Sequence, residues 1–215
     1  MQTRLNNQIH ITKQDVLAEQ QRLRKSLRRQ RLSLSIHIRR RAEQAVVRQM
    51  RRQPNFVNAQ RVGLYLDAFG EVPTGALIQL CFKLRKAVYL PVVRSVNQPL
   101  SWSRITRHQW QNQRMIKHRF GMKQPLMQRG VSVKVLDCLF MPLVGFDLNG
   151  YRLGMGGGFY DRTLASCSTT GKEQTKPWRI GIAYDFQRVD SLHSNHWDIS
   201  LHAIVTQSGY RRFQS

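Results

Sequence analysis

The stretch RVGLYLDAFGEVPTGALIQLCFKLRKAVYLPVV, residues 61 to 93, holds two short apolar runs with a helical pattern between them. RVGLYL (61–66) and AVYLPVV (87–93) are rich in β-branched and aromatic residues, which predicts strands. Thr74 stands where it can cap a helix that runs to about Leu84. This order of strand, helix and strand predicts two parallel strands joined by a right-handed crossover.

Further apolar runs extend the same pattern along the chain. VLDCLFMPLV (135–144), RIGIAY (179–184) and HAIVT (202–206) predict three more strands. The predicted fold class is therefore α/β, with three layers: a mainly parallel, open, Rossmann-like sheet with flanking helices. STTGKEQTKP (168–177) is a polar loop, and no internal repeat is present.

The N-terminal part of the chain predicts two helices. Thr12 and Asp15 have the spacing of a capping box, and Val16, Leu23 and Leu27 follow at roughly helical spacing. The second helix is indicated by Ala42, Ala45, Val46 and Met50. We expect residues 12–215 to form a single domain, preceded by an N-terminal extension over residues 1–11.

The composition indicates a globular protein with an unusual excess of positive charge. Its 35 Lys and Arg against 12 Asp and Glu give a net charge of +23, which attracts polyanions such as nucleic acid, nucleotides and polycarboxylates. The three cysteines form no CxxC or zinc pattern, so a disulfide framework or structural zinc is not expected. Neither a signal peptide nor an 18-residue apolar run is present, which predicts a cytoplasmic protein without membrane attachment.

RLGMGGGFYDR (152–162) places a glycine-rich turn between a strand and a predicted helix that contains residues 161–166 in its first turns. Backbone N–H groups at such a junction can converge on an anion. Phe159 excludes the dinucleotide spacing GxGxxG, and no GxxxxGK[ST] exists in the chain. A plain tight turn is the alternative, but Arg152 and Arg162 could bind phosphate oxygens and Asp161 could hold Mg²⁺.

MPLVGFDLNGYRLGMGGGFYDRTL (141–164) resembles the signature segment of the 5-formyltetrahydrofolate cyclo-ligase family, also called methenyltetrahydrofolate synthetase. Other segments resemble that family in the same order along nearly the whole chain. They are RKSLRRQRLSLS (24–35), GEVPT (70–74), VYLPVV (88–93), FGMKQP (120–125) and HWDISLHAIVT (196–206).

The resemblance implies an enzyme that converts 5-formyltetrahydrofolate to 5,10-methenyltetrahydrofolate with consumption of MgATP. The formyl oxygen is phosphorylated, the second folate nitrogen attacks the activated carbon, and phosphate leaves. Arginines, backbone amides and Mg²⁺ suit phosphoryl transfer, which depends on positioning and charge stabilisation. The expected partners are ATP and a reduced folate, with or without a polyglutamyl tail.

The resemblance also implies site residues. Those for ATP would be Arg24, Lys25, Arg28, Arg152, Leu153, Gly154, Met155, Gly156, Gly157, Gly158, Phe159, Tyr160 and Arg162. Those for the folate would be Leu66, Glu71, Met155, Gly156, Gly157, Gly158 and Phe159. Asp161 and Asp198 would hold Mg²⁺, and no residue is assigned to proton transfer.

Some residues depart from the family pattern. Gln124 stands where the family turn usually has Glu, and Val92 where many members have a basic residue that Arg94 could replace. Trp197 precedes Asp198, so the family's histidine lies one place earlier, at His196. His193 and His196 have H-x-x-H spacing, but a third strong zinc ligand is lacking.

Two alternatives belong to other classes. One is a basic nucleic-acid-binding protein on the same fold, favoured by the runs Arg39–Arg41, Arg51–Arg52 and Arg211–Arg212. The sequence has no aromatic platform among these arginines and no common nucleic-acid-binding motif, so this alternative is not favoured. The other is an enzyme of related architecture that acts on a sugar phosphate or an acyl-CoA without ATP.

Overall fold

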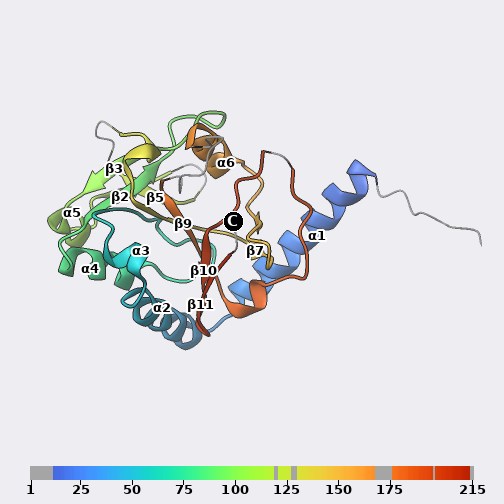
Figure 1. Ribbon diagram of the computed structural model, residues 1–215, viewed down its shortest axis with the longest axis horizontal. Helices are drawn as coiled ribbons and strands as arrows, with labels where there is room; N and C mark the ends of the chain where they lie inside the picture. The colour runs from blue at the N-terminus through green and yellow to red at the C-terminus, as the bar shows by residue number, and fades with distance from the viewer. Residues whose placement is uncertain (1–11, 119–120, 127–129, 168–175, 196, 214–215) are drawn as a thin grey trace, which may run out of the picture.

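The computed structural model describes residues 12–118, 121–126, 130–167, 176–195 and 197–213. The expected N-terminal extension and most of the polar loop 168–177 lie outside the described residues. A central sheet crosses the molecule, with α2, α3 and α4 on one side of it and α6 on the other (Figure 1). The predicted three-layer α/β architecture is confirmed.

The central sheet has seven strands in the order β11-β10-β9-β6-β1-β2-β3. Its five inner strands pair in parallel, and they are the strands that the apolar runs predicted, each shorter than its run. They are β1 (Arg61–Gly63), β2 (Ala87–Val92), β6 (Cys138–Met141), β9 (Trp178–Ile182) and β10 (Ala203–Val205). Every residue of β6 and β9 is buried, as expected for strands covered on both faces.

The remaining strands were not predicted. The edge strands β3 (Ser101–Ile105) and β11 (Tyr210–Arg212) pair antiparallel with β2 and β10. Exposed arginines on both interrupt the apolar pattern, because one side of an edge strand faces water. Two small hairpins join β4 (Met115–Lys117) to β5 (Lys123–Pro125) and β7 (Gly145–Phe146) to β8 (Arg152–Leu153).

Six α-helices surround the sheet in the described part of the chain. They are α1 (Lys13–Leu32), α2 (Ile36–Met50), α3 (Pro54–Val57), α4 (Gly75–Lys83), α5 (Arg107–Gln111) and α6 (Phe159–Leu164). Short 3₁₀ turns cover Val133–Val135, Ala165–Cys167 and Asp185–Gln187. None of the described helices has the length and apolar character that a membrane span requires.

Two apolar clusters cover the two faces of the sheet. On one face, Val46 and Met50 of α2 and Ile78 of α4 pack in the same cluster as strand residues such as Val62 and Phe140. The second cluster, on the other face, joins α6 to the sheet through Leu164, Trp102, Leu139 and Met141. The buried residues of α2 include those that predicted this helix, so that prediction is confirmed.

The strand order reverses between β1 and β6. From β1 the chain crosses to β2 on one side, and it later returns to place β6, β9 and β10 on the other side. The loops that leave β1 and β6 therefore separate at the carboxyl edge of the sheet. Open α/β sheets bind their ligands at this position.

The helix caps are only partly as predicted. The capping box of Thr12 and Asp15 at the start of α1 is confirmed. Thr74 occupies the N-cap of α4, but its hydroxyl donates to the carbonyl of Tyr65 at 2.7 Å instead of accepting from the helix. A carboxylate oxygen of Glu43, from α2, accepts from the N–H of Ala76 at 2.7 Å. A neighbouring helix therefore caps α4.

We expect Glu43→Ala to lower the free energy of unfolding by about 1 to 2 kcal/mol, because a helix N–H loses its acceptor. Glu43→Gln keeps a carbonyl oxygen and should lose about half of that or less. Urea denaturation measures both changes. Gln44→Ala, an exposed neighbour on α2, is the control, and a cost for E43A no larger than for Q44A would contradict the capping role.

Candidate active site

A cleft of about 920 Å³ opens at the carboxyl ends of β1, β2 and β6. Its walls are formed by the loop after β1, the end of β2, the loop after β6, residues 151–162, and residues 192–195 with 197–198. Gln20 and Arg24 of α1, Leu100 and residues 122–124 complete it. The volume is that of pockets that hold small-molecule ligands, and the position is the topological switch point.

The glycine turn forms one wall of this cleft. Gly156 and Gly158 have positive φ angles of 94° and 61°, which L-residues rarely adopt. Gly154 has no positive φ, and a Cβ there would meet no heavy atom within 4 Å. Neither backbone conformation nor packing therefore requires a glycine at 154. Because the residue lines the cleft, its missing side chain leaves room for a ligand.

Arg152 and Asp161 form an ion pair beside the turn. Arg152 Nη2 lies 2.5 Å from Oδ1 of Asp161, and Nη1 donates to the carbonyl of Ile199. The side chain of Arg152 is 6% exposed and that of Asp161 is 28% exposed, so the carboxylate is the more accessible partner. Among the described residues, none donates a hydrogen bond to Oδ2 of Asp161, which leaves that oxygen available to a cation.

The predicted N-terminal cations occupy different positions. Arg24 Nε donates to the carbonyl of Gly154 at 2.9 Å, so α1 contacts the glycine turn directly. Arg28 is half-buried with its guanidinium 5.8 Å from the ring centroid of Phe69, and Lys25 is exposed. Only Arg24 of these three cations lines the cleft.

Arg162 lines the cleft and also braces the turn. Its Nη2 donates to the carbonyls of Gly157 at 2.6 Å and Val96 at 2.8 Å. The guanidinium lies 5.2 Å from the ring centroid of Phe159, which lines the same cleft. Arg162 thus ties the turn to the segment after β2 while it adds positive charge to the cleft.

The two predicted metal ligands, Asp161 and Asp198, both line the cleft. Asp198 Oδ2 accepts from the N–H of Asn195 at 2.7 Å. No group of three His, Cys, Asp or Glu side chains in the described ranges could hold a metal ion by itself. Two aspartates suit Mg²⁺, which commonly takes one or two carboxylates and completes its shell with phosphate oxygens and water.

The predicted histidine pair is described only in part. His193 lines the cleft, and its Nε2 lies 3.8 Å from a carboxylate oxygen of Glu19. His196 lies outside the described residues.

Glu71 lines the cleft, and its side chain is 10% exposed. One oxygen accepts from the N–H of Ala68 at 3.0 Å, and the other lies 3.7 Å from Nη1 of Arg31. Burial raises the pKa of Glu71 to about 7, and the charge of Arg31 and the Ala68 hydrogen bond offset only part of this effect. The group therefore titrates near neutral pH.

Two residues of this region, Tyr65 and Arg31, were not identified from the sequence. Tyr65 is 3% exposed and lines the cleft, and its hydroxyl has no hydrogen-bond partner among the described residues. Burial raises the pKa of Tyr65 well above its usual range, so the hydroxyl is a protonated donor for a ligand. It lay within a predicted strand, where an aromatic is expected to be core.

Arg31, the second missed residue, is 1% exposed. It donates from Nε to the carbonyl of Phe69 at 3.0 Å and from Nη1 to that of Leu143 at 3.1 Å. These carbonyls belong to the loops after β1 and β6. No local signal separates Arg31 from the other arginines around it.

Tyr160 and Leu66, predicted to line the site, do so. Burial raises the pKa of Tyr160, so its hydroxyl stays protonated. Leu66 is half-buried just beyond Tyr65. Leu153, Met155 and Gly157 also lie on the cleft wall, as expected for residues of the glycine turn.

The structure also places the residues that depart from the family pattern. Gln124 lines the cleft and accepts from the N–H of Val93 at 3.2 Å, so it fixes the end of β2. Val92 is buried in β2, and Arg94 donates to the hydroxyl of Ser101 at 3.3 Å outside the cleft. Trp197 is 54% exposed and lines the cleft.

A family model described as the 5-formyltetrahydrofolate cyclo-ligase family matches residues 16–207. The 5-formyltetrahydrofolate cyclo-ligase of Haemophilus influenzae is 35% identical over 196 residues, which cover 87% of this chain and 97% of that protein. The Escherichia coli K12 protein of the same name is 38% identical over 169 residues, with 77% and 87% covered.

Two solved structures are also similar to this chain. The 5,10-methenyltetrahydrofolate synthetase of Aquifex aeolicus superposes with a TM-score of 0.75 at 31% identity, over 91% of this chain and 93% of that one. The synthetase from Mycoplasma pneumoniae, at 23% identity and a TM-score of 0.66, shares the fold over 88% and 99% of the two chains.

We expect the free energy of unfolding to fall as pH rises between 4.5, the ordinary pKa of a glutamate, and about 7. Below pH 4.5 Glu71 is protonated in both the folded and the unfolded protein. Between pH 4.5 and about 7 only the folded protein keeps this proton. The stability that the raised pKa provides is therefore lost as the pH rises through about 7. The change is on the order of 3 kcal/mol.

Urea denaturation across this pH range measures the slope, and Glu71→Gln should lack this contribution. Asp190→Asn, which removes an exposed carboxylate, is the control and should keep the wild-type slope. An identical slope in E71Q and the wild type would show that Glu71 does not titrate near neutral pH.

Proposed function

The chain belongs to the 5-formyltetrahydrofolate cyclo-ligase family, and on this premise we propose that it converts 5-formyltetrahydrofolate to 5,10-methenyltetrahydrofolate with consumption of MgATP. The formyl oxygen takes the γ-phosphoryl group of ATP and ADP leaves. The second folate nitrogen then attacks the activated carbon, a proton is lost from that nitrogen, and phosphate leaves. The single observation that supports ATP binding is the open space beside Gly154, where Arg24 and Arg152 also line the cleft.

The glycine turn supports phosphate binding through its surroundings. Gly154 and Gly156 would both accept a Cβ without meeting any atom within 4 Å, so phosphate oxygens can approach the backbone closely. Arg24 and Arg152 line the cleft near the turn and supply guanidinium groups for these oxygens. Phosphoryl transfer depends on positioning and charge stabilisation, and no covalent nucleophile is needed.

Asp161 and Asp198 are the proposed Mg²⁺ ligands. Each has one carboxylate oxygen engaged within the protein, through Arg152 and Asn195 respectively. Mg²⁺ would neutralise charge that develops on the phosphate oxygens during transfer. Arg152 holds Asp161 in place, which keeps this carboxylate oriented towards the cleft before the nucleotide arrives.

Glu71 and two tyrosines are proposed to bind the ring end of the folate. The amino-oxo edge of the pterin offers two N–H donors, and a buried carboxylate can accept both. The hydroxyl of Tyr65, which has no partner in the part of the chain that the structure describes, supplies a donor to a ring oxygen or nitrogen. The ring of Tyr160 offers a flat apolar face on the same cleft.

The substrate also fits the setting that the sequence predicts. Cys81, Cys138 and Cys167 are buried free thiols, which suit a reducing cytoplasm where ATP and reduced folates are available. We propose that both free and polyglutamylated folates are accepted.

The test is a spectroscopic assay for 5,10-methenyltetrahydrofolate. We expect product from 5-formyltetrahydrofolate only when ATP and Mg²⁺ are both present, with ADP formed in equal amount. Chelation of Mg²⁺ with EDTA should abolish turnover, and excess Mg²⁺ should restore it. Product at the same rate without ATP would reject the mechanism, and no product under any condition would reject the function.

Gly154→Ala tests the glycine turn. The added methyl group has space in the protein, so the melting temperature should stay within about 2 °C of the wild type. Because the methyl group projects where phosphate is proposed to lie, the KM for ATP should rise on the order of tenfold or more.

Gly209→Ala is the matched control. Its Cβ also meets no atom within 4 Å, its φ is not positive, and it lies in the turn between β10 and β11. This variant should keep the wild-type KM for ATP. Equal KM values for G154A and G209A would remove Gly154 from the ATP site.

A further inference from the structure

The parallel strands of the central sheet start at the edge that lies opposite the cleft, which we call the amino edge. Because β1, β2, β6, β9 and β10 pair in parallel, their first residues lie side by side there. The last strand, β11, is antiparallel to β10, and its last residue, Arg212, pairs with Ala203, the first residue of β10. Nothing in the proposed chemistry uses the amino edge.

Exposed cations stand just before or at the starts of these strands and at the end of β11. Neighbouring strands lie about 4.8 Å apart, so the distance from β11 across β10, β9, β6 and β1 to β2 is about 24 Å. The exposed cations along this distance, which we call the basic row, are Arg61, Arg85, Lys176, Arg211 and Arg212.

The structure brings two separate arginine runs of the sequence to this edge. Arg211–Arg212 is part of the basic row itself. Arg51–Arg52 is exposed after α2, and the chain then leads through α3 to the start of β1. Lys86, just before β2, donates to the carbonyl of Val57 in α3 at 2.7 Å, so α3 lies beside the basic row.

The carboxylate at this edge is already engaged. Asp137 is the one acidic residue among the described residues at these strand starts. Its Oδ2 accepts from the N–H of Arg61 at 2.9 Å, and its Oδ1 lies 3.0 Å from Nζ of Lys176. The side chains of Arg85 and Arg211 form no hydrogen bond or ion pair with any described residue. A row of separated cations with so little opposing charge favours a linear polyanion.

Aromatic rings at the β11 end of the row favour nucleic acid among linear polyanions. His202, just before β10, stacks on Trp178 with 4.4 Å between the ring centroids, and the guanidinium of Arg212 lies 5.0 Å from the Trp178 centroid. Cations that follow a phosphate backbone and planar groups on which bases stack are the two parts of single-strand binding. Of the described residues that start β1, β6, β9 and β10, none is an exposed large apolar residue of the kind that inserts into a membrane surface.

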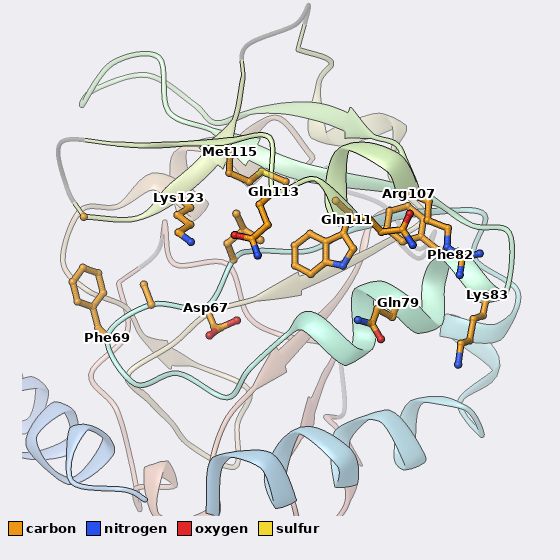
Figure 2. A pocket seen from close by; sticks show the side chains of 14 residues that line it. Asp67, Phe69, Gln79, Phe82, Lys83, Arg107, Gln111, Gln113, Met115 and Lys123 are labelled. Atoms are coloured by element: carbon orange, nitrogen blue, oxygen red, sulfur yellow. The ribbon is translucent and has the colours of Figure 1, made fainter. Parts of the chain in front are cut away.

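The basic row is separate from both cavities of the protein that lie near the loop after β1. A second cavity of about 920 Å³ adjoins the cleft, and Lys83 and Arg107 lie at one end of it (Figure 2). None of the cations of the row lines this cavity or the cleft. A ligand on the row therefore leaves the cleft open.

We propose that the amino edge binds single-stranded nucleic acid, with phosphates along the basic row and bases against the planar groups at its β11 end. The surface lies across the sheet from the cleft, so nucleic acid and the small-molecule substrates bind at the same time. This second role does not depend on the proposed function.

The test is fluorescence anisotropy with a labelled oligouridylate of about twelve nucleotides, for the wild type and for the triple variant R52Q/R61Q/R211Q. The variant should bind at least about fivefold more weakly at low salt. Each phosphate contact to a single strand adds about 0.7 to the slope of log K against log salt, so the variant should lose about 2 from this slope. Saturating MgATP should not release the RNA, and release would place it in the cleft and overturn the proposal.

The control is R22Q/R29Q/R40Q, which removes three exposed cations of α1 and of the first half of α2 and has the same change in net charge. It should keep the wild-type affinity and slope, and melting temperatures verify that both variants fold. An equal loss in both triple variants, or an unchanged affinity in R52Q/R61Q/R211Q, would overturn the proposal.

Two further probes test the kind of partner. Wild-type protein should bind the oligouridylate more tightly than duplex RNA of the same length, and more tightly than vesicles of equal parts phosphatidylcholine and phosphatidylserine. Tighter binding to the duplex or to the vesicles would overturn the assignment to single strands. None of these measurements involves turnover, so failure of this surface and failure of the proposed reaction are detected separately.

Discussion

The cleft depends on one buried guanidinium. Arg31, in the last turn of α1, donates to the carbonyls of Phe69 and Leu143, which follow β1 and β6 on the two sides of the switch point. The same side chain therefore fixes two walls of the cleft and the helix that crosses them. Glu71, 3.7 Å away, reduces the cost of burying this charge, and the cation keeps the raised pKa of that carboxyl from rising further. The position of Arg24 against the glycine turn follows from the same anchor.

The fold uses most of the few carboxylates of the chain as hydrogen-bond acceptors. Of the eleven acidic side chains that the structure describes, nine accept hydrogen bonds: Asp15, Glu43, Asp67, Glu71, Asp137, Asp147, Asp161, Asp185 and Asp198. Most of these carboxylates accept from backbone N–H groups, and few of them form ion pairs with exposed arginines. The net charge of +23 makes the field around the molecule strongly positive, which raises the local concentration of anions, nucleic acid included.

The sequence predicted the parallel strands and the glycine turn, because a strand buried on both faces must be apolar and a strained turn must contain glycine. It did not predict features that depend on contacts between distant segments. Glu43 caps a helix 33 residues away, and Thr74, the expected cap, bonds elsewhere. Arg31 and Tyr65 have ordinary local patterns, since burial of a cation or of an unpaired hydroxyl is decided only when α1 and the sheet meet. Antiparallel edge strands were missed because solvent on one side allows polar residues.

Three of the four glycines of the turn are of two kinds, and Gly157 belongs to neither, because a Cβ there would meet the ring of Phe159 at 3.0 Å. Gly156 and Gly158 have positive φ angles, so the backbone path alone requires them. Gly154 has neither a positive φ nor a neighbour within 4 Å of a Cβ, so the protein could accept a side chain there without strain. A tight turn needs only the first kind. Gly154 lines the cleft, so its missing side chain leaves space where something that is not part of the chain can approach the backbone, whereas Gly209 has the same freedom outside the cleft.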